Sequence, residues 1–549
     1  MAEKKFILAL DAGTTSNRAI LFDGNADMVA VAQQEFPQYY PQPGWVEQDA
    51  NEIWESQYAV AKEAMVKAGV TAEEIAGIGI ANQRETTILW DRKTGEPVYH
   101  AIVWQCRRTA GRIEELKKSS WKASAVSGKD DSDAVSRQTD AGVDDIVRDK
   151  TGLILDPYFS ASKIEWILDH VDGLRERAER GEILFGTVET WLVWKLTEGA
   201  LHITDVSNAS RTCLFNIHSL KWDEQLLGLF HIPKKILPKV VSNSEIYGES
   251  DAQLFGAPIP ICGLAGDQQA ALFGQQCTRE GDAKVTYGTG AFLLLNTGSH
   301  IVRSENGLLS TVAWQLGAEG EVSYALEGSI FTAGSAVQWL RDDVGLIADS
   351  SETESLAESV EDTAGCYLVP AFTGLGAPYW RADARGILTG LTRAVKRAHI
   401  VRATVESMAY QVRDVLALMV DELQKDADMP KEKDPDRALL MKGGRTADDD
   451  HPVVSHSVLK VDGGASRNNF LLQFQADISD QTVIRPSNVE STALGAVLMA
   501  GLACGFWTPD ELSGLNPKER EFTPKMAEDR RQVLLKGWHN AVERALYEK

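Results

Sequence analysis

The sequence lacks the features that mark secreted, membrane-spanning and zinc-binding proteins. Its six cysteines are scattered over 549 residues and form no CxxC pair, so neither a zinc site nor a disulfide framework is expected. No apolar run approaches the roughly 18 residues of a membrane span, and Asp11 interrupts the apolar stretch near the first residue, which argues against a signal peptide. We therefore expect a cytoplasmic protein with reduced thiols and no stable membrane association.

Acidic residues outnumber basic ones. The chain carries 56 Lys and Arg against 79 Asp and Glu, which gives a formal net charge of −23. A nucleic-acid partner would require a basic surface, so none is expected. Two nucleotide-binding signatures are also missing, because the chain has neither a GxxxxGK[ST] loop nor a His-Arg-Asp catalytic loop. Their absence excludes P-loop NTPases and protein kinases.

Near its start the chain contains a predicted hairpin whose turn has a carboxylate, a glycine, hydroxyl groups and an arginine. Apolar runs at residues 6–10 and 19–22 flank a polar turn, and this pattern predicts a β-hairpin. Glycine lets backbone N–H groups approach a ligand, hydroxyl groups bind phosphate oxygens, and a carboxylate can hold hydrated Mg²⁺. The turn therefore indicates a phosphate and magnesium site, although an ordinary polar turn would explain it if it stood alone. The groups concerned are Asp11, Gly13, Thr14, Thr15, Ser16 and Arg18.

A second hairpin of the same kind lies near the middle of the chain. Residues 283–295 again read as strand, Gly/Thr turn and strand, with Gly288 and Thr289 in the turn. Internal repetition dictates architecture, and 549 residues are too many for one core. The sequence therefore predicts two similar α/β domains, 1–274 and 275–549, that clasp one nucleotide between them. Polar insertions at about 119–149 and about 424–456 interrupt these domains.

Further polar groups follow predicted strands. An adjacent Arg84–Glu85 pair lies after the strand at residues 75–80, and such a pair can bind vicinal hydroxyls of a polyol, although a solvated salt bridge fits equally well.

Residues 87–90 and 101–104 are expected to form a strand pair. Asp267 lies where an apolar strand gives way to a helix; it could be only a helix cap, but the two glutamines that follow favour a function. Residues 461–469 resemble a phosphate loop ahead of a helix. Together these groups fit phosphoryl transfer, in which an acid takes the proton of the attacking hydroxyl.

Nearly the whole chain, apart from the two insertions and the C-terminal end, resembles the FGGY carbohydrate kinases of the actin/Hsp70-like superfamily. The stretches that carry the resemblance are residues 10–18, 82–86, 103–108, 156–160, 266–269, 287–290, 372–380 and 461–464. The resemblance implies an α/β fold of two duplicated ribonuclease-H-like (actin-like) domains with a nucleotide and substrate cleft between them. It also implies ATP-dependent phosphorylation of glycerol to sn-glycerol 3-phosphate, the first step of glycerol catabolism, with Mg²⁺ and in a homo-oligomer, either dimer or tetramer.

The resemblance assigns roles position by position. Asp267 would be the catalytic base of an in-line transfer and, with Asp11, a ligand of Mg²⁺. Glycerol would be bound by Arg84, Glu85, Tyr158, Asp267 and Gln268, with Trp104 and Phe292 packed on its carbon chain. The nucleotide would be bound by Thr14, Thr15, Ser16, Arg18, Thr289, Gly334, Gln338, Gly464 and Asn468.

Two alternative functions fit the same fold, and two regulatory mechanisms of the family are not expected in this chain. A kinase of another small polyol or ketose, such as dihydroxyacetone, erythritol or xylulose, would use the same machinery. A filament or chaperone with the same ATP-clasping fold would leave the polyol-binding cluster unexplained. Family members inhibited by fructose 1,6-bisphosphate carry a glycine-rich, Arg-containing loop, which residues 247–256 do not match, and Gln253 replaces the histidine whose phosphorylation activates other members. Neither control is expected here.

Overall fold

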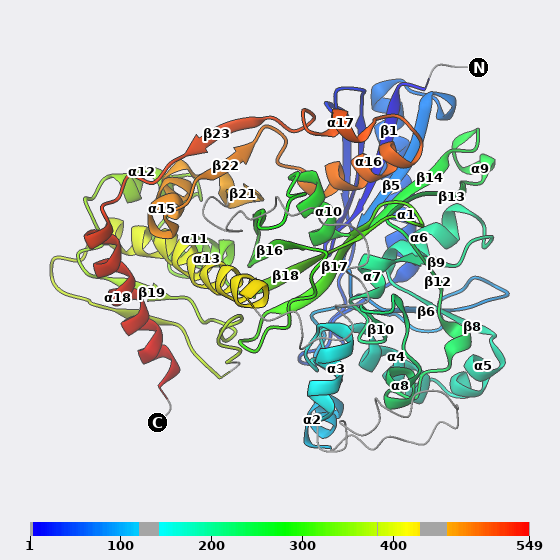
Figure 1. The fold of residues 1–549 in the computed structure, drawn as a ribbon, viewed down its shortest axis with the longest axis horizontal. Helices are drawn as coiled ribbons and strands as arrows, with labels where there is room; N and C mark the ends of the chain where they lie inside the picture. Colours follow the sequence, from blue (N-terminus) through cyan, green and yellow to red (C-terminus); the bar gives the residue numbers. More distant parts are fainter. Residues whose placement is uncertain (1–3, 120–141, 382, 429–457, 548–549) are drawn as a thin grey trace. The chain divides into compact units, whose positions relative to one another are not determined.

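The computed structural model describes residues 4–119, 142–381, 383–428 and 458–547 (Figure 1). The chain forms two compact units, of which the first comprises Met1–Gly274, Leu309–Tyr324 and Ser491–Leu515. The second comprises Gln275–Leu308, Ala325–Glu490 and Asn516–Lys549. Two later segments of the chain, Leu309–Tyr324 and Ser491–Leu515, thus join the first unit. Most of both expected insertions lies outside the described residues.

A six-stranded sheet forms the centre of the first unit, with strand order β13-β14-β5-β1-β2-β3. The first hairpin is confirmed, because β1 and β2 pair antiparallel with Asp11 opposite Arg18. Strands β1, β5 and β14 run parallel. Their bounds are β1 Phe6–Ala12, β2 Ser16–Phe22, β3 Met28–Glu35, β5 Ile75–Asn82, β13 Ser244–Glu249 and β14 Pro260–Gly266.

Three helices cover this sheet. Helix α1 (Ala50–Ala68) packs on β2 and β3, and Asp49 caps it by accepting a hydrogen bond from the backbone N–H of Asn51 at 2.8 Å. Helix α16 (Ser491–Ala503) packs on β1, β5 and β14 and also on α10 (Asp267–Gly274). A Cβ atom on Gly495 would lie 1.8 Å from the carbonyl oxygen of Ala270, so only glycine allows α10 and α16 to approach so closely.

A second apolar core of the first unit includes Phe159, Phe185 and Phe230. The predicted pairing of residues 87–90 with 101–104 is present only in part. Thr87 and Ile102 form an antiparallel bridge with two backbone hydrogen bonds of 3.0 Å, whereas β6 pairs with β8 and β7 pairs with β4. The polar excursion also ends earlier than expected, because α3 begins at Val143. The strands are β4 Glu47–Gln48, β6 Ile88–Asp91, β7 Ala101–Ile102, β8 Ile183–Gly186, β9 Ile203–Asp205, β10 Phe215–Asn216, β11 Lys221–Trp222, β12 Lys239–Val241 and β17 Leu309–Gln315. The helices are η1 Ala72–Glu74, α2 Ala110–Lys118, α3 Val143–Thr151, α4 Ser160–His170, α5 Leu174–Arg180, α6 Val188–Leu196, α7 Val206–Ala209, α8 Glu224–Leu229, η3 Lys234–Ile236, α9 Ala252–Phe255 and α17 Pro509–Leu512.

The second unit repeats the sheet of the first. Its strands follow in the order β18-β16-β15-β21-β22-β23. The second predicted hairpin is β15–β16, which is antiparallel, and β15 runs parallel to β21, just as β1 runs parallel to β5. An antiparallel edge strand follows in both sheets, β13 in one and β23 in the other. The duplication expected from the two hairpins is therefore present in strand order and direction.

A large apolar core holds the second unit together. Helix α13 (Arg397–Asp428) contributes Tyr410, whose ring stacks on that of Trp538 at 5.1 Å between centroids. Figure 1 shows α13 in yellow and α18 in red. The strands are β15 Ala283–Tyr287, β16 Ala291–Gly298, β18 Val322–Ile330, β19 Tyr367–Val369, β20 Ile387–Thr389, β21 Leu459–Asp462, β22 Val483–Pro486 and β23 Lys518–Phe522. The other helices are α11 Gly334–Asp342, α12 Glu352–Glu358, η5 Gly464–Arg467, α15 Asn469–Ser479 and α18 Glu528–Leu546.

Candidate active site

The carboxyl ends of β5 and β14 bring three predicted site residues together in the first unit. These parallel strands are neighbours, with Gly266 opposite Asn82, so the residues that follow them meet at one edge of the sheet. Arg84 Nε lies 3.2 Å from Asp267 Oδ1 and 3.6 Å from Glu85 Oε1. The Arg84 and Glu85 side chains are buried, whereas that of Asp267 is 34% exposed. The acid at this site can therefore be reached by a ligand.

The start of α10 fixes the orientation of that acid. The backbone N–H of Gln268 donates to Asp267 Oδ1 at 2.8 Å. Gln269, which was not predicted as a site residue, accepts a hydrogen bond from Arg84 Nη1 at 3.2 Å. A Cβ atom on Gly266 would lie 2.5 Å from Arg84 Cγ. The Gly266-Asp-Gln-Gln269 sequence thus supplies the space for Arg84 and two hydrogen bonds at the site.

Trp104 contacts both Tyr158, which is predicted to bind the polyol, and Thr14, which is predicted to bind phosphate. Trp104 and Tyr158 pack edge to face with their ring centroids 5.4 Å apart, a favourable geometry for aromatic rings. Trp104 Nε1 also donates a hydrogen bond to Thr14 Oγ1 at 3.0 Å. The structure therefore places Trp104 and Tyr158, both predicted to contact glycerol, beside the turn predicted to bind phosphate.

Three glutamines that the sequence analysis missed hold this turn. The Thr14 carbonyl oxygen accepts hydrogen bonds from Gln48 Nε2 at 2.7 Å and Gln38 Nε2 at 3.0 Å. Gln83 Nε2 bonds the Gly13 carbonyl oxygen at 3.3 Å and Gln48 Oε1 at 2.9 Å. These side chains engage backbone carbonyl groups of the turn. The predicted residue Ser16 accepts a hydrogen bond from Gln33 Nε2 at 2.9 Å, and Thr15 is exposed.

In the second unit, the turn of the β15–β16 hairpin is tied to the start of α11. The backbone N–H of Gly334 donates to the Gly288 carbonyl oxygen at 3.0 Å, and that of Ser335 donates to the Thr289 carbonyl oxygen at 3.0 Å. A Cβ atom on Gly334 would lie 2.5 Å from the same Gly288 oxygen. Thr289 and Gly334 are thus brought together, and Gln338 lies one turn further along α11.

The loop after β21 lies at the same edge of this sheet, because Asp462 pairs with Thr286 of β15. The position of a Cβ atom on Gly464 has no heavy atom within 4 Å, so a ligand could approach the backbone there. Asn468 caps α15 through a hydrogen bond from the backbone N–H of Leu471 at 2.9 Å. The predicted residue Phe292 belongs to β16 of this second unit.

The acidic groups suit Mg²⁺ bound together with phosphate. Among the described residues, no cluster of three or more His, Cys, Asp or Glu side chains is arranged to hold a metal ion. Mg²⁺ commonly keeps several water ligands and uses one or two carboxylates with substrate phosphates, so Asp11 and Asp267 fit that chemistry. The part of the chain that the structure describes also contains no helix with the length and apolarity that a membrane crossing requires.

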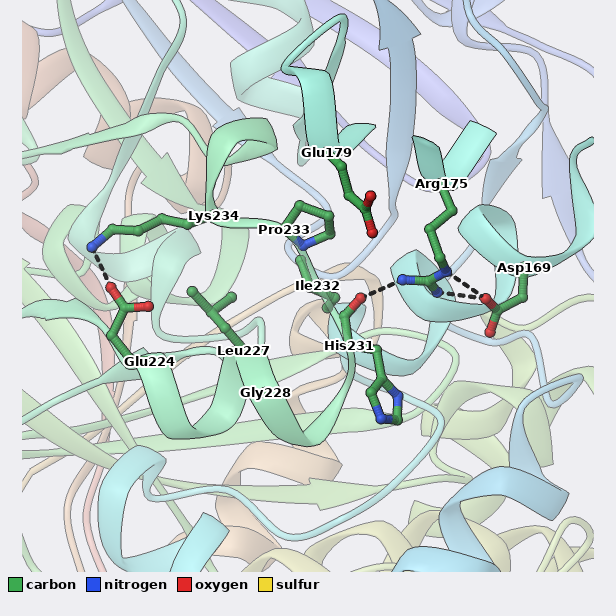
Figure 2. A pocket seen from close by; sticks show the side chains of 10 residues that line it. All are labelled: Asp169, Arg175, Glu179, Glu224, Leu227, Gly228, His231, Ile232, Pro233 and Lys234. Atoms are coloured by element: carbon green, nitrogen blue, oxygen red, sulfur yellow. Dashed lines mark hydrogen bonds and ion pairs between the residues drawn. The ribbon is translucent and has the colours of Figure 1, made fainter. Parts of the chain in front are cut away.

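A pocket of about 670 Å³ lies elsewhere in the first unit, among α4, α5 and α8 (Figure 2). Its charged side chains are of both signs and largely pair with each other, as Arg175 does with Asp169 at 2.5 Å. None of the predicted site residues lines it. The lining residues are Asp169, Arg175, Glu179, Glu224, Leu227, Gly228, His231, Ile232, Pro233 and Lys234.

The duplicated fold, the two Gly/Thr hairpins and the acid at a strand end define an actin-like phosphotransferase, and the chain belongs to the FGGY family of carbohydrate kinases. The N-terminal domain of this family matches residues 6–132 and 131–274. Its C-terminal domain matches residues 283–504. The family and the fold class expected from the sequence are confirmed.

Within this family, the chain is similar to proteins named glycerol kinase. That of Agathobacter rectalis is 54% identical over 98% of both chains, and that of Caldanaerobacter subterraneus subsp. tengcongensis is 52% identical over 99% of both. The crystal structure of Plasmodium falciparum glycerol kinase with ADP has a TM-score of 0.84 at 35% identity over 100% of both chains. A xylulose kinase from Lactobacillus acidophilus has a TM-score of 0.78 at 19% identity over 98% of this chain and 97% of that one, a similarity of fold alone.

Proposed function

We propose that the protein transfers the γ-phosphoryl group of ATP to glycerol and releases ADP and sn-glycerol 3-phosphate. The observation that carries this proposal is the buried Arg84–Glu85 pair beside the accessible carboxylate of Asp267. The arrangement offers a donor, an acceptor and a base to neighbouring hydroxyl groups. The full-length similarity to glycerol kinases supports glycerol as the substrate.

In this reaction the oxygen of a glycerol hydroxyl attacks the γ-phosphorus, and Asp267 accepts the proton of that hydroxyl. The bond between the γ-phosphorus and the bridging oxygen breaks, and ADP leaves with that oxygen. Arg84 and Glu85 orient the hydroxyls, together with Tyr158 and Gln268. Phosphoryl transfer depends mainly on positioning and charge neutralisation, which suits a site with no covalent nucleophile.

The proposal assigns the phosphate groups to the first hairpin and the rest of the nucleotide to the second unit. Thr14, Thr15, Ser16 and Arg18 would bind the terminal phosphates. Mg²⁺, held by Asp11 and Asp267, would neutralise charge on the phosphates. Trp104 and Phe292 would pack on the glycerol carbons. The remaining nucleotide contacts would come from Thr289, Gly334, Gln338, Gly464 and Asn468.

Asn468 is the least direct of these assignments. Its side-chain oxygen caps α15, and its Nδ2 donates to Thr353 Oγ1 at 3.1 Å. The side chain would therefore support the loop that contains Gly464, and the backbone of that loop would meet the nucleotide. We further propose that residues 1–274 and 275–549 correspond to the two FGGY domains.

The proposal also covers location and assembly. All six cysteines are free, which suits the reducing cytoplasm, where ATP is available. From the family resemblance we also propose a homo-oligomer, and gel filtration with light scattering measures its mass in solution. A monomeric mass would remove that part and leave the catalytic assignment intact.

Identification of the product tests the proposed reaction. The protein is incubated with Mg-ATP and glycerol, and the product is presented to an NADH-forming dehydrogenase that accepts only sn-glycerol 3-phosphate. Stoichiometric NADH relative to ADP is expected. ADP without this product would contradict the proposal, and turnover of dihydroxyacetone, erythritol or xylulose in place of glycerol would support a kinase of that substrate.

A further inference from the structure

The segment Asp205–Arg211 is attached to the ends of both strands that carry the candidate site. Asp205 Oδ1 accepts hydrogen bonds from the backbone N–H groups of Ser207 at 2.8 Å and Asn208 at 3.1 Å, which caps α7. Ser207 Oγ then accepts a hydrogen bond from the backbone N–H of Gly266 at 3.0 Å. Because Gly266 precedes Asp267, the segment contacts the chain next to the proposed base.

The same segment holds the end of β5. The Asn208 and Asn82 side chains exchange two hydrogen bonds, each of 3.0 Å. Asn82 is fully buried and lies two residues before Arg84. Hydrogen bonds between buried polar side chains favour one arrangement of the chain. The α7 segment therefore links the two strand ends whose side chains must converge on a substrate.

Arg211 extends this link to the site itself. Its side chain is completely buried, and its Nε donates to Glu85 Oε1 at 2.9 Å. Arg84 Nε approaches the same oxygen, at 3.6 Å. The Arg211 guanidinium also lies over the Phe159 ring at 5.3 Å from its centroid, a contact that favours arginine over lysine.

The backbone of Glu85 is held from the same side. Its carbonyl oxygen accepts hydrogen bonds from Ser160 Oγ at 3.3 Å and from Lys163 Nζ at 3.5 Å. Lys163 also donates to the carbonyl oxygens of Tyr158 and Phe159. Glu85 is therefore fixed at its backbone by α4 and at its carboxylate by Arg211.

We propose that Arg211 is a positioning residue that orients the carboxylate of Glu85 toward the hydroxyl groups of the polyol. This inference rests on the proposed function. Charges alternate from Arg211 through Glu85 and Arg84 to Asp267. Without Arg211, the Glu85 carboxylate would draw more strongly on Arg84, and Arg84 would be displaced from Asp267. Removal of one member of a buried ion pair leaves an uncompensated charge. The loss of Arg211 would therefore also disturb the contacts that Glu85 and Arg84 make with the polyol.

A double-mutant cycle of Arg211→Lys and Glu85→Gln tests this role. Arg211→Lys keeps the charge but loses the planar guanidinium, and we expect its KM for glycerol to rise about tenfold or more. In the Glu85→Gln background the same change should alter kcat/KM less than about twofold, because residues that act through one another are not additive. Affinity for ADP, measured by calorimetry, should stay within about twofold of wild type in all variants.

Arg402→Lys is the matched control. Arg402, in α13 of the second unit, bonds Glu406 at 2.7 Å and lies over the Phe470 ring at 4.9 Å, so it repeats the ion pair and ring contact of Arg211 without contact to Glu85. This control should leave the KM for glycerol unchanged. An unchanged KM in Arg211→Lys, or additive effects in the cycle, would overturn the role of Arg211 while wild-type turnover still supports the proposed function. No polyol-dependent turnover by the wild-type protein would overturn both.

Discussion

Asp267 Oδ1 lies 3.2 Å from Arg84 Nε, and the two residues follow neighbouring parallel strands, β14 and β5. The contact joins positions 84 and 267, and it depends on Gly266, where any Cβ atom would meet Arg84. The partly exposed carboxylate can be reached by a substrate hydroxyl, whose proton it can accept.

Replacement of this carboxylate should separate binding from turnover. Asp267→Asn keeps the shape of the side chain but removes the proton acceptor, so we expect kcat to fall by about 10²- to 10⁴-fold. ADP affinity, measured by calorimetry without Mg²⁺, should change little, because the phosphate-binding turn is held by other side chains. Turnover close to that of wild type would remove Asp267 from the role of base.

Trp104 offers a test of the link between the aromatic pair and the phosphate turn. Trp104→Phe keeps a ring beside Tyr158 but loses the hydrogen bond to Thr14 Oγ1. A neutral hydrogen bond contributes about 1 kcal/mol, so we expect the KM for ATP to rise several-fold. Trp104→Leu removes the ring as well and should also raise the KM for glycerol. Equal effects of both variants on both substrates would contradict the separation of these two roles.

Because α10 and α16 pack closely at Gly495, replacement of this glycine should destabilise the protein. Gly495→Ala would place Cβ 1.8 Å from the Ala270 carbonyl oxygen, and the forced separation should lower the free energy of unfolding by about 1–3 kcal/mol. Gly111→Ala in α2 is the control, because that Cβ would meet nothing within 4 Å. The control should be neutral or stabilising by up to about 1 kcal/mol. Equal urea midpoints for the two variants would show that α10 and α16 can separate without cost.

A buried histidine predicts a stability change with pH. Burial, opposed by a hydrogen bond of 2.8 Å with the Phe185 carbonyl oxygen, lowers the pKa of His202 to about 4, whereas the pKa in the unfolded chain is about 6.5. As pH falls below about 6.5 the unfolded state takes up a proton that the folded state refuses until about pH 4, so stability is lost across this window.

The comparison of wild type with His202→Gln isolates this effect. Between pH 7 and pH 5 the wild-type free energy of unfolding should fall by about 2 kcal/mol more than that of the variant. Urea unfolding followed by tryptophan fluorescence measures it, because the His202 ring packs against Trp90 at 5.5 Å between centroids. Parallel pH profiles for the two proteins would assign the acid sensitivity to other groups.

The region that would match the regulatory loop predicts no response to fructose 1,6-bisphosphate. Here Asp251 caps the short helix α9 through the backbone N–H of Gln253, and Glu249 ends β13. A sugar bisphosphate would meet two carboxylates, which repel its phosphates. The rate of ADP release should be the same with and without the bisphosphate at saturating substrates, and inhibition would show that it binds through other residues.

The sequence predicted the elements whose signal is local. Both hairpins, the strand that ends before Arg84 and the junction at Asp267 follow from apolar runs broken by glycine and polar residues, and the structure contains all of them. The duplication followed from the likeness of the two hairpins. The roles of individual residues came from the family resemblance, since the chemistry of an Arg–Glu pair alone does not distinguish a polyol site from a salt bridge.

Long-range pairing could not be predicted in the same way. Strand β6 pairs with β8, from Ile183 onward, and not with the nearby β7, because tertiary packing decides partners that are equally apolar. Gln48 and Arg211 act on the site from distant segments through side chains of types common on protein surfaces. Asp205 caps α7 in the structure, but nothing in the local sequence predicts the contact of Ser207 with Gly266.

The rate of ADP release with Mg-ATP, measured as kcat/KM for glycerol, dihydroxyacetone, erythritol and xylulose, tests the central assignment most directly. The account predicts that glycerol is preferred over each of the others by at least about tenfold, a difference of about 1.4 kcal/mol in transition-state binding. Preference for a larger polyol, or ADP release that no polyol stimulates, would contradict the assignment of Arg84, Glu85 and Asp267 to glycerol.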